Sequence, residues 1–235
     1  MALPKLNSNP SYEVTIPSTG KKVYFRPFLV KEQKNLLIAL ETQDRKDLLR
    51  AIVKTIEACV EEKITSPLTT YDVDYLFTTI RAKSVGEQTE LVFQCDNCEH
   101  KNKVVVELDK LQIANLDLSN MVAISDTITV KMRPPTYEEF LGSESLAKST
   151  TQSQLVFELI LLCMESVHTE EELISIQDET REDIVHFIES MTAAQYEKLA
   201  NYIGNVPYVY KDLEFVCSEC GTENKRTLQG MDDFF

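Results

Sequence analysis

Hydrophobic and polar residues alternate in two short segments near the start of the chain. Residues 12–16 and 22–28 follow a two-residue period, and the turn-forming residues Pro17, Ser18, Thr19 and Gly20 separate them. A two-residue period places successive side chains on opposite faces of a strand, and a turn of this composition joins neighbouring antiparallel strands. The pattern therefore predicts a β-hairpin.

A helical period replaces the alternation after this hairpin. Residues 31–41 and 46–62 are predicted amphipathic helices, because their apolar residues recur every three or four positions. In the second half of the chain, Val156, Ile160, Cys163 and Val167 are expected on one face of another helix. The Ser- and Thr-rich segment 142–153 is expected to be a flexible connection. Helical bodies joined to small antiparallel β elements define an α+β fold.

Three sequence landmarks occur twice, in the same order. They are a strand that runs into Arg-Pro with a Glu six residues after the Arg, a capping box that opens a helix, and the pattern Leu-x-Phe-x-Cys-x-x-Cys-x-x-x-Asn-Lys. The two Arg-Pro strands run from Val23 to Arg26 and from Ile128 to Arg133, the capping boxes begin at Thr69 and Thr180, and the Cys patterns begin at Leu91 and Leu213. Chance could repeat the first two landmarks, but all three together indicate an internal duplication. We expect a first repeat over 1–120 and a second over 121–235, the second with an extra helix at about 192–203.

The third landmark contains the clearest candidate chemistry. Cys95 and Cys98, like Cys217 and Cys220, have the spacing of a knuckle, a tight turn that directs two thiolates at one metal ion. The 118 residues between Cys98 and Cys217 far exceed the separation in an ordinary zinc ribbon. A duplicated chain can still bring two half-sites together, so we expect one structural Zn²⁺ on all four cysteines, in a shared β element that resembles a zinc ribbon. A zinc ion shared between chains, no zinc, and redox use of the Cys pairs are the alternatives.

Other residues give little indication of catalysis. Cys59 and Cys163 lie on apolar helix faces, where a free cysteine packs as a small hydrophobic residue. The chain contains six glycines, and the Gly-rich phosphate loop, the Gly-x-Ser-x-Gly elbow and the His-Glu-x-x-His motif are all absent. We therefore expect a protein that is not an enzyme.

Charge and hydropathy restrict the possible classes of partner and the expected compartment. The chain has 24 Lys and Arg against 38 Asp and Glu, a net charge of −14, which disfavours direct nucleic-acid binding. The longest apolar run, residues 155–164, is too short for a membrane span and contains Glu158. The first residues lack the apolar core of a secretory signal, so a reducing cytosol is the expected compartment.

The last residues combine two acids with Phe234 and Phe235. A frayed end is one interpretation, because chain termini are commonly poorly ordered. The other is a docking peptide whose aromatic pair fills a pocket of a partner protein.

A longer run of residues carries a family resemblance. The segments MALPKLN, YEVTIPSTGKKVYFRPFLVKEQKNLLIALE and DVDYLFTTIRAKSVGE resemble the baseplate hub proteins of T-even-like contractile-tailed bacteriophages, and the similarity continues more weakly through the second half. The resemblance implies a non-enzymatic hub subunit or assembly protein that contacts other baseplate and tail proteins. It implies a location in the host cytoplasm during assembly or in the baseplate of the virion tail. The zinc site rests on the cysteine spacing alone, and a zinc-ribbon regulatory module that contacts nucleic acid or the transcription machinery is the alternative function.

Overall fold

The computed structural model describes residues 10–42 and 44–234. In the described residues the chain forms two compact units. Unit 1 consists of Met1–Ser66, Tyr71–Ala114 and Tyr208–Phe235, and unit 2 of Pro67–Thr70 and Asn115–Pro207. The last strands therefore belong to the same unit as the first. The repeats are predicted from similarity within the sequence, whereas the compact units are defined by contacts between residues. The boundaries of the repeats and those of the units therefore need not coincide.

Unit 1 begins with the predicted hairpin. Strand β1 (Tyr12–Thr15) pairs antiparallel with β2 (Lys22–Phe25), in a register that places Tyr12 opposite Phe25. Gly20 closes the turn at a φ of +67°, a left-handed conformation that glycine adopts without steric cost. Val14, Val23 and Phe25 are buried, so the alternation produces one buried face as expected.

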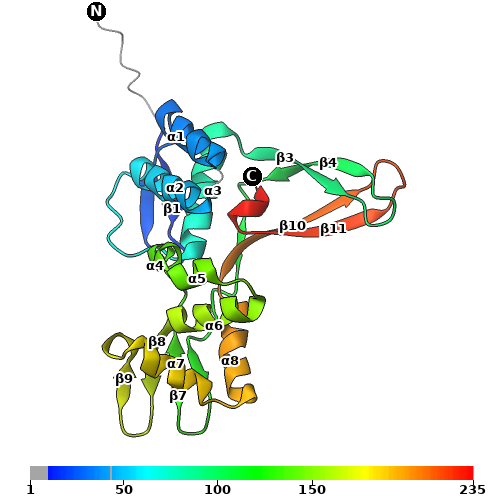
Figure 1. Cartoon of the computed structure of the whole chain (residues 1–235). Helices are drawn as coiled ribbons and strands as arrows, with labels where there is room; N and C mark the ends of the chain where they lie inside the picture. The colour runs from blue at the N-terminus through cyan, green and yellow to red at the C-terminus, as the bar shows by residue number, and fades with distance from the viewer. Residues whose placement is uncertain (1–9, 43, 235) are drawn as a thin grey trace, which may run out of the picture. The chain divides into compact units, whose positions relative to one another are not determined.

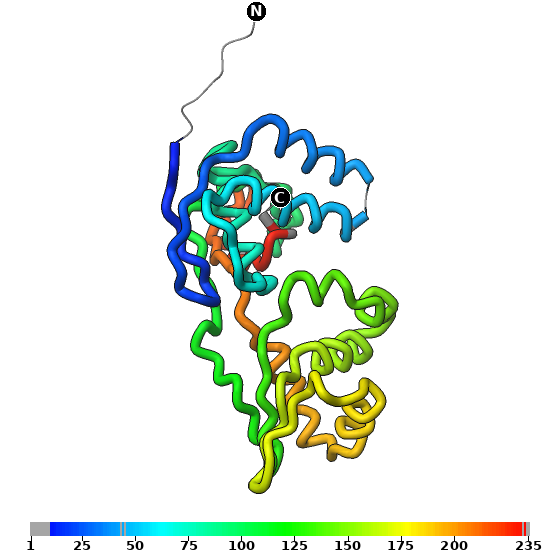
Figure 2. Tube along the Cα trace, turned by 90° about the vertical axis from the view of Figure 1, so that its left-hand side faces the viewer, coloured from blue at the N-terminus to red at the C-terminus, as the bar shows by residue number. Residues whose placement is uncertain are grey.

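Three helices carry most of the remaining core of unit 1. They are α1 (Val30–Glu41), α2 (Arg45–Cys59) and α3 (Thr70–Val85), and α1 and α2 lie side by side (Figures 1 and 2). Ile56, Leu76 and Ile80 are fully buried. The predicted helix 46–62 ends earlier, at Cys59, because Val60 is extended and forms a bridge with Phe25.

Two antiparallel ribbons complete unit 1. One pairs β3 (Gln88–Gln94) with β4 (Lys101–Glu107), and the other pairs β10 (Tyr208–Val216) with β11 (Glu223–Gln229). Strand β5 (Gln112–Ala114) pairs with β10, and the short helix η2 (Met231–Phe234) follows β11. Buried Val106, Leu213 and Leu228 join the two ribbons in one apolar cluster, and the ribbons lie side by side in Figure 1. The predicted strands around each Cys pair are thereby confirmed.

Unit 2 contains a four-stranded antiparallel sheet. Its strands, in spatial order, are β6 (Met121–Ala123), β7 (Thr129–Met132), β8 (Met164–His168) and β9 (Leu173–Ser175). The pairing places Val122, Val130, Val167 and Ile174 in one row across the sheet. This apolar row belongs to the core that also contains Ile160, Ile188 and Leu199.

The helical segments of unit 2 differ in part from the prediction. They are α4 (Tyr137–Gly142), α5 (Glu144–Lys148), α6 (Gln152–Cys163), η1 (Ile176–Asp178), α7 (Arg181–Glu189) and α8 (Ala193–Gly204). The helix expected near 192–203 is confirmed as α8. In the described part of the chain, no helix combines the length and apolar character needed to cross a membrane.

Two local expectations for unit 2 are wrong. The segment 142–153 was expected to be flexible, but it contains α5, which Ser143 caps and whose Leu146 is buried. Val167 was expected on a helix with Cys163, but α6 ends at Cys163 and Val167 lies on β8. An apolar run alone cannot distinguish a buried strand from the continuation of a buried helix.

The Arg-Pro landmark has the same surroundings in both halves. The backbone N–H of Arg26 donates to the Cys59 carbonyl at 3.0 Å, and that of Arg133 donates to the Cys163 carbonyl at 2.8 Å. The guanidinium of Arg26 pairs with Glu32 at 2.9 Å, and that of Arg133 pairs with Glu139 through two bonds of 2.6 and 2.7 Å. Each glutamate also accepts the backbone N–H three residues before it, at the start of its helix. The landmark is thus a strand-to-helix junction fixed by one ion pair.

Candidate metal centre

Four cysteine thiols meet at the tips of the two ribbons. The Sγ atoms of Cys95, Cys98, Cys217 and Cys220 all lie within 4.8 Å of one another. The Sγ atoms of Cys95 and Cys220 are 3.6 Å apart, as are those of Cys98 and Cys217. A disulfide has sulfurs about 2.05 Å apart, so these are free thiols. A tetrahedral zinc ion with Zn–S bonds of about 2.3 Å separates its sulfurs by about 3.8 Å, so the cluster has dimensions that fit one zinc ion.

Each cysteine pair is held by the same turn. In the first knuckle, the N–H of Cys95 donates to the His100 carbonyl and the N–H of Glu99 donates to the Cys95 carbonyl, both at 3.0 Å. In the second, the N–H of Cys217 donates to the Thr222 carbonyl at 2.9 Å, and the N–H of Gly221 donates to the Cys217 carbonyl at 3.0 Å. Glu99 and Gly221 occupy corresponding positions with φ of +59° and +72°. The two loops therefore have one backbone design, although only the second uses glycine at the left-handed position.

Phenylalanine side chains pack directly behind the knuckles. The rings of Phe93 and Phe215 stack with centroids 5.9 Å apart. Each precedes the first cysteine of its knuckle by two residues, so each lies on the same strand face as that cysteine. This contact brings the ribbons together just beside the thiols.

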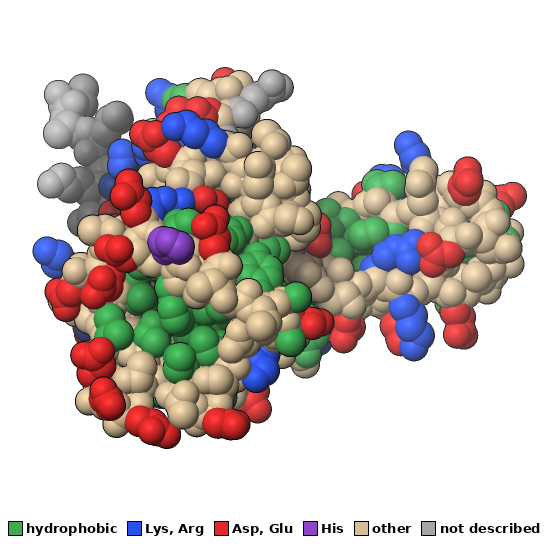
Figure 3. All heavy atoms as spheres, turned by 60° about the horizontal axis from the view of Figure 1, so that its bottom comes forward, with side chains coloured by type: hydrophobic (Ala, Val, Ile, Leu, Met, Phe, Trp, Pro, Cys, Tyr) green, Lys and Arg blue, Asp and Glu red, His purple; other side chains and the backbone are tan. Residues whose placement is uncertain are grey.

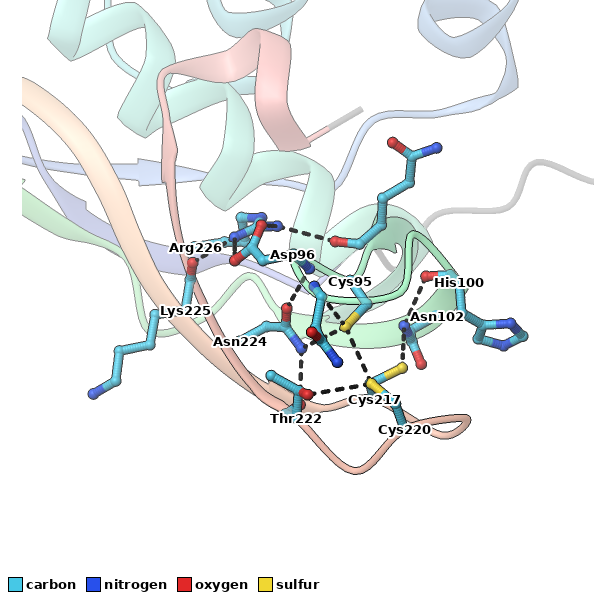
Figure 4. Close-up of polar contacts among 12 residues, drawn as sticks. Cys95, Asp96, His100, Asn102, Cys217, Cys220, Thr222, Asn224, Lys225 and Arg226 are labelled. Atoms are coloured by element: carbon cyan, nitrogen blue, oxygen red, sulfur yellow. Dashed lines mark hydrogen bonds and ion pairs between the residues drawn. The ribbon is translucent and has the colours of Figure 1, made fainter.

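Two buried asparagines cross between the knuckles. Asn102 donates to Cys217 Sγ at 3.5 Å, and Asn224 donates to Cys95 Sγ at 3.6 Å. Both asparagines belong to the third sequence landmark. Their spacing from the cysteines did not predict a role, because their partners lie on the opposite ribbon. Figure 4 shows these contacts around the sulfurs.

An ion pair links the knuckles on one side only. Arg226 donates to both carboxylate oxygens of Asp96, at 2.5 and 2.8 Å, and also to the Gln94 carbonyl at 3.0 Å (Figure 4). The Arg226 guanidinium accordingly lowers the pKa of Asp96. Val104 and Ser218 occupy the corresponding positions in the other copy. Because this pair is solvent-accessible, its contribution to stability is modest.

The pKa values of two of the clustered thiols are shifted in opposite directions. The pKa of Cys220 is lowered to about 5, first of all by its hydrogen bond with the Thr222 hydroxyl at 3.2 Å. The backbone N–H of His100 lowers the pKa of Cys98, but hydrogen bonds with the other thiols and burial raise it further, to about 12. Crowded thiols behave in this way because one ionised sulfur is stabilised by neighbours that keep their protons. A bound divalent cation would favour ionisation of all four.

The two remaining cysteines are separate from the cluster. Cys59 and Cys163 are each 1% exposed, at the ends of α2 and α6. Burial raises the pKa of Cys59 to about 11 and that of Cys163 to about 12, so both are protonated at neutral pH. Their predicted place in the core is confirmed.

Comparison with known proteins identifies the family of the chain. The family model described as T4 bacteriophage base plate protein matches residues 9–235. No curated protein and no solved structure matches the chain at a significant level. The chain belongs to the T4 bacteriophage base plate protein family.

Proposed function

We propose that this chain is a non-enzymatic component of the baseplate hub, which acts through protein–protein contacts and is stabilised by one structural zinc ion. The family match supports the baseplate assignment. The observation that carries the zinc proposal is the meeting of four thiols from two hairpins far apart in the sequence. Their role would be architectural, because four protein ligands leave a zinc ion no open position for substrate.

The donor set favours zinc over the hard divalent cations. Four thiolates in tetrahedral proximity select Zn²⁺ or an iron–sulfur centre over Mg²⁺ and Ca²⁺, which prefer oxygen ligands. Sulfur separations of 3.6 Å match a single ion. Cys95, Cys98, Cys217 and Cys220 would hold it, and the ion would supply a cross-link between the ribbons.

Elemental analysis tests the metal proposal. Protein purified without chelator should contain about one zinc per chain. Cys95→Ser and Cys217→Ser should each abolish zinc binding, because the remaining thiolates of both knuckles are needed to close the site. Cys59→Ser is the matched control and should retain the metal. A monomeric variant that still binds about one zinc per chain after one cysteine pair has been replaced would contradict the shared site. Iron found in place of zinc would change the identity of the cofactor.

The distribution of charge supports a role in protein contacts. Between residues 115 and 207, 16 Asp and Glu accompany only 5 Lys and Arg, so unit 2 carries most of the net charge of −14. Figure 3 shows acidic side chains around a group of hydrophobic ones on one face of the molecule. Such a surface suits a baseplate partner with basic and apolar residues and repels nucleic acid.

Mass spectrometry of phage particles tests the hub assignment. A hub subunit should be recovered from purified virions, whereas an assembly factor should be recovered only from baseplate intermediates in the host cytoplasm. The four-cysteine cluster keeps a regulatory zinc-ribbon module as the second candidate. Recovery with polymerase or DNA instead of tail proteins would favour that candidate.

The end of the chain is a second proposed contact. Met231 is buried and the backbone N–H of Gln229 donates to Asp233 at 2.8 Å, so η2 is anchored to unit 1. Phe234 is the last residue of η2, and Phe235 lies outside the described residues. We expect Phe234→Ala with Phe235→Ala to weaken association with a hub partner while Met231 preserves the fold. Unchanged association would support a frayed end instead.

The internal duplication also remains a proposal. Both halves contain a hairpin, an Arg–Glu junction, a helix that ends in cysteine, and a Cys-x-x-Cys ribbon. Superposition of the two halves should place Phe25 on Met132 and Cys95 on Cys217. Placement of either pair on different elements would contradict a duplication.

A further inference from the structure

Two side-chain amides are buried beside the candidate metal centre. Asn102 is 5% exposed and Asn224 is 1% exposed. Each stands seven residues after the first cysteine of its own knuckle, on the inner face of β4 or β11. A buried amide is costly unless all its polar atoms find partners, so the partners of these two amides indicate what they do.

Each amide binds its own loop and the opposite knuckle. Asn102 donates to the His100 carbonyl of its own loop at 3.0 Å and to Cys217 Sγ across the interface. Its Oδ1 accepts the backbone N–H of Ser218, also across the interface, at 2.9 Å. The carboxamide thus contacts the second knuckle with both of its ends.

Asn224 repeats this arrangement in the reverse direction. It donates to the Thr222 carbonyl at 2.9 Å and to Cys95 Sγ at 3.6 Å. Its Oδ1 accepts the backbone N–H of Asp96 at 2.9 Å. A backbone N–H can only donate and a carbonyl can only accept, so these partners fix the orientation of both amides.

We propose that Asn102 and Asn224 are positioning residues that form a reciprocal clasp between the knuckles. Each accepts a backbone N–H of the opposite knuckle and donates to the first cysteine sulfur there. The clasp sets the relative position of the two cysteine pairs, and its effect on metal affinity rests on the proposed zinc function.

Asparagine suits both tasks of the clasp. A tetrathiolate zinc site carries an excess of two negative charges, and an N–H donor to a thiolate stabilises that charge. Alanine would remove donor and acceptor together. Aspartate would keep the acceptor for the opposite N–H but would replace the donor with a negative charge beside the sulfur.

Backbone amide hydrogen exchange tests the clasp directly. The N–H groups of Ser218 and Asp96 each donate to an asparagine of the opposite ribbon, so loss of that acceptor should accelerate their exchange. Asn102→Ala should accelerate exchange at Ser218, and Asn224→Ala should accelerate it at Asp96. Asn201→Ala, at an exposed position of α8, is the control and should change neither.

Metal measurements test the donor half of the clasp. Asn102→Ala and Asn102→Asp should each weaken zinc affinity by about 10- to 100-fold, measured by competition with a chromophoric chelator. The Asp variant should nevertheless keep slow exchange at Ser218. In the cobalt-substituted protein, the sulfur-to-cobalt absorption band should shift in both variants and stay unchanged in Asn201→Ala.

Distinct results would overturn the two proposals. Acceleration confined to the mutated knuckle, or wild-type affinity in Asn102→Asp, would refute the clasp. Wild-type protein that binds neither zinc nor cobalt would refute the zinc function. In that case the crossed exchange pattern in metal-free protein would still decide whether the clasp exists.

Discussion

Removal of the metal should loosen the ribbons of unit 1 and spare unit 2. A zinc ion on both knuckles closes a loop of 118 residues between Cys98 and Cys217. Because unit 2 stays folded over Asn115–Pro207, only about 25 residues of this loop (99–114 and 208–216) gain freedom when the ribbons open. In the chain-entropy treatment of cross-links, closing a loop of that length stabilises the closed ribbons by about 3 kcal/mol. The cysteines of the cluster all lie in unit 1, whereas the core of unit 2 around Ile160 and Leu199 contains none of them.

Hydrogen-exchange mass spectrometry before and after chelation measures this effect. About 3 kcal/mol corresponds to a change of about two decades in an opening equilibrium, because each factor of ten is about 1.4 kcal/mol. Peptides from 88–107 and 208–229 should therefore lose most of their protection. Peptides from 156–167 and 184–203 should keep theirs, since their apolar contacts lie within unit 2.

Two results would refute the reasoning. Unchanged protection of the ribbons after complete loss of metal would mean that the Phe93–Phe215 contact and its neighbours hold the ribbons without a cross-link. Equal loss of protection in both units would mean that the chain unfolds as one cooperative body. Cys59→Ser carried through the same chelation is the control for the handling of thiols.

Three further predictions concern single residues. Burial opposes ionisation of Glu139, but the Arg133 and Thr136 hydrogen bonds outweigh it and hold its pKa below 4.5. The stability from this lowered pKa is present above about pH 4.5 and is lost as the pH falls through the folded pKa, so the stability difference between wild type and Glu139→Gln in urea should shrink on acidification. Gly221→Ala should lower the free energy of unfolding by about 1 kcal/mol, because φ is +72° with open space for a Cβ, and should leave zinc content unchanged. Phe215→Ala should cost about 3 kcal/mol in thermal or denaturant unfolding, and a loss below about 1 kcal/mol would contradict its place between the ribbons.

The sequence by itself determined the local elements of this protein. Alternation near Val14 and Val23, the helical period around Ile56, and the Thr180 cap are properties of a few neighbouring residues, and the structure confirms each of them. The Cys-x-x-Cys spacing likewise specifies a knuckle turn without any distant contact. Such a pattern can be interpreted without tertiary contacts, because the backbone geometry of a helix or a strand sets its period.

Tertiary structure decided the features that depend on distant partners. Val167 became a strand residue because β7 and β9 pair with β8, and α5 formed because Leu146 finds a buried environment. The sequence predicted the four cysteines as one cluster only through the argument from duplication. The roles of Asn102 and Asn224 could not be predicted, because each amide finds its partners on the opposite ribbon, more than a hundred residues away in the sequence. Pairing between ribbons is a property of packing, which no single segment specifies.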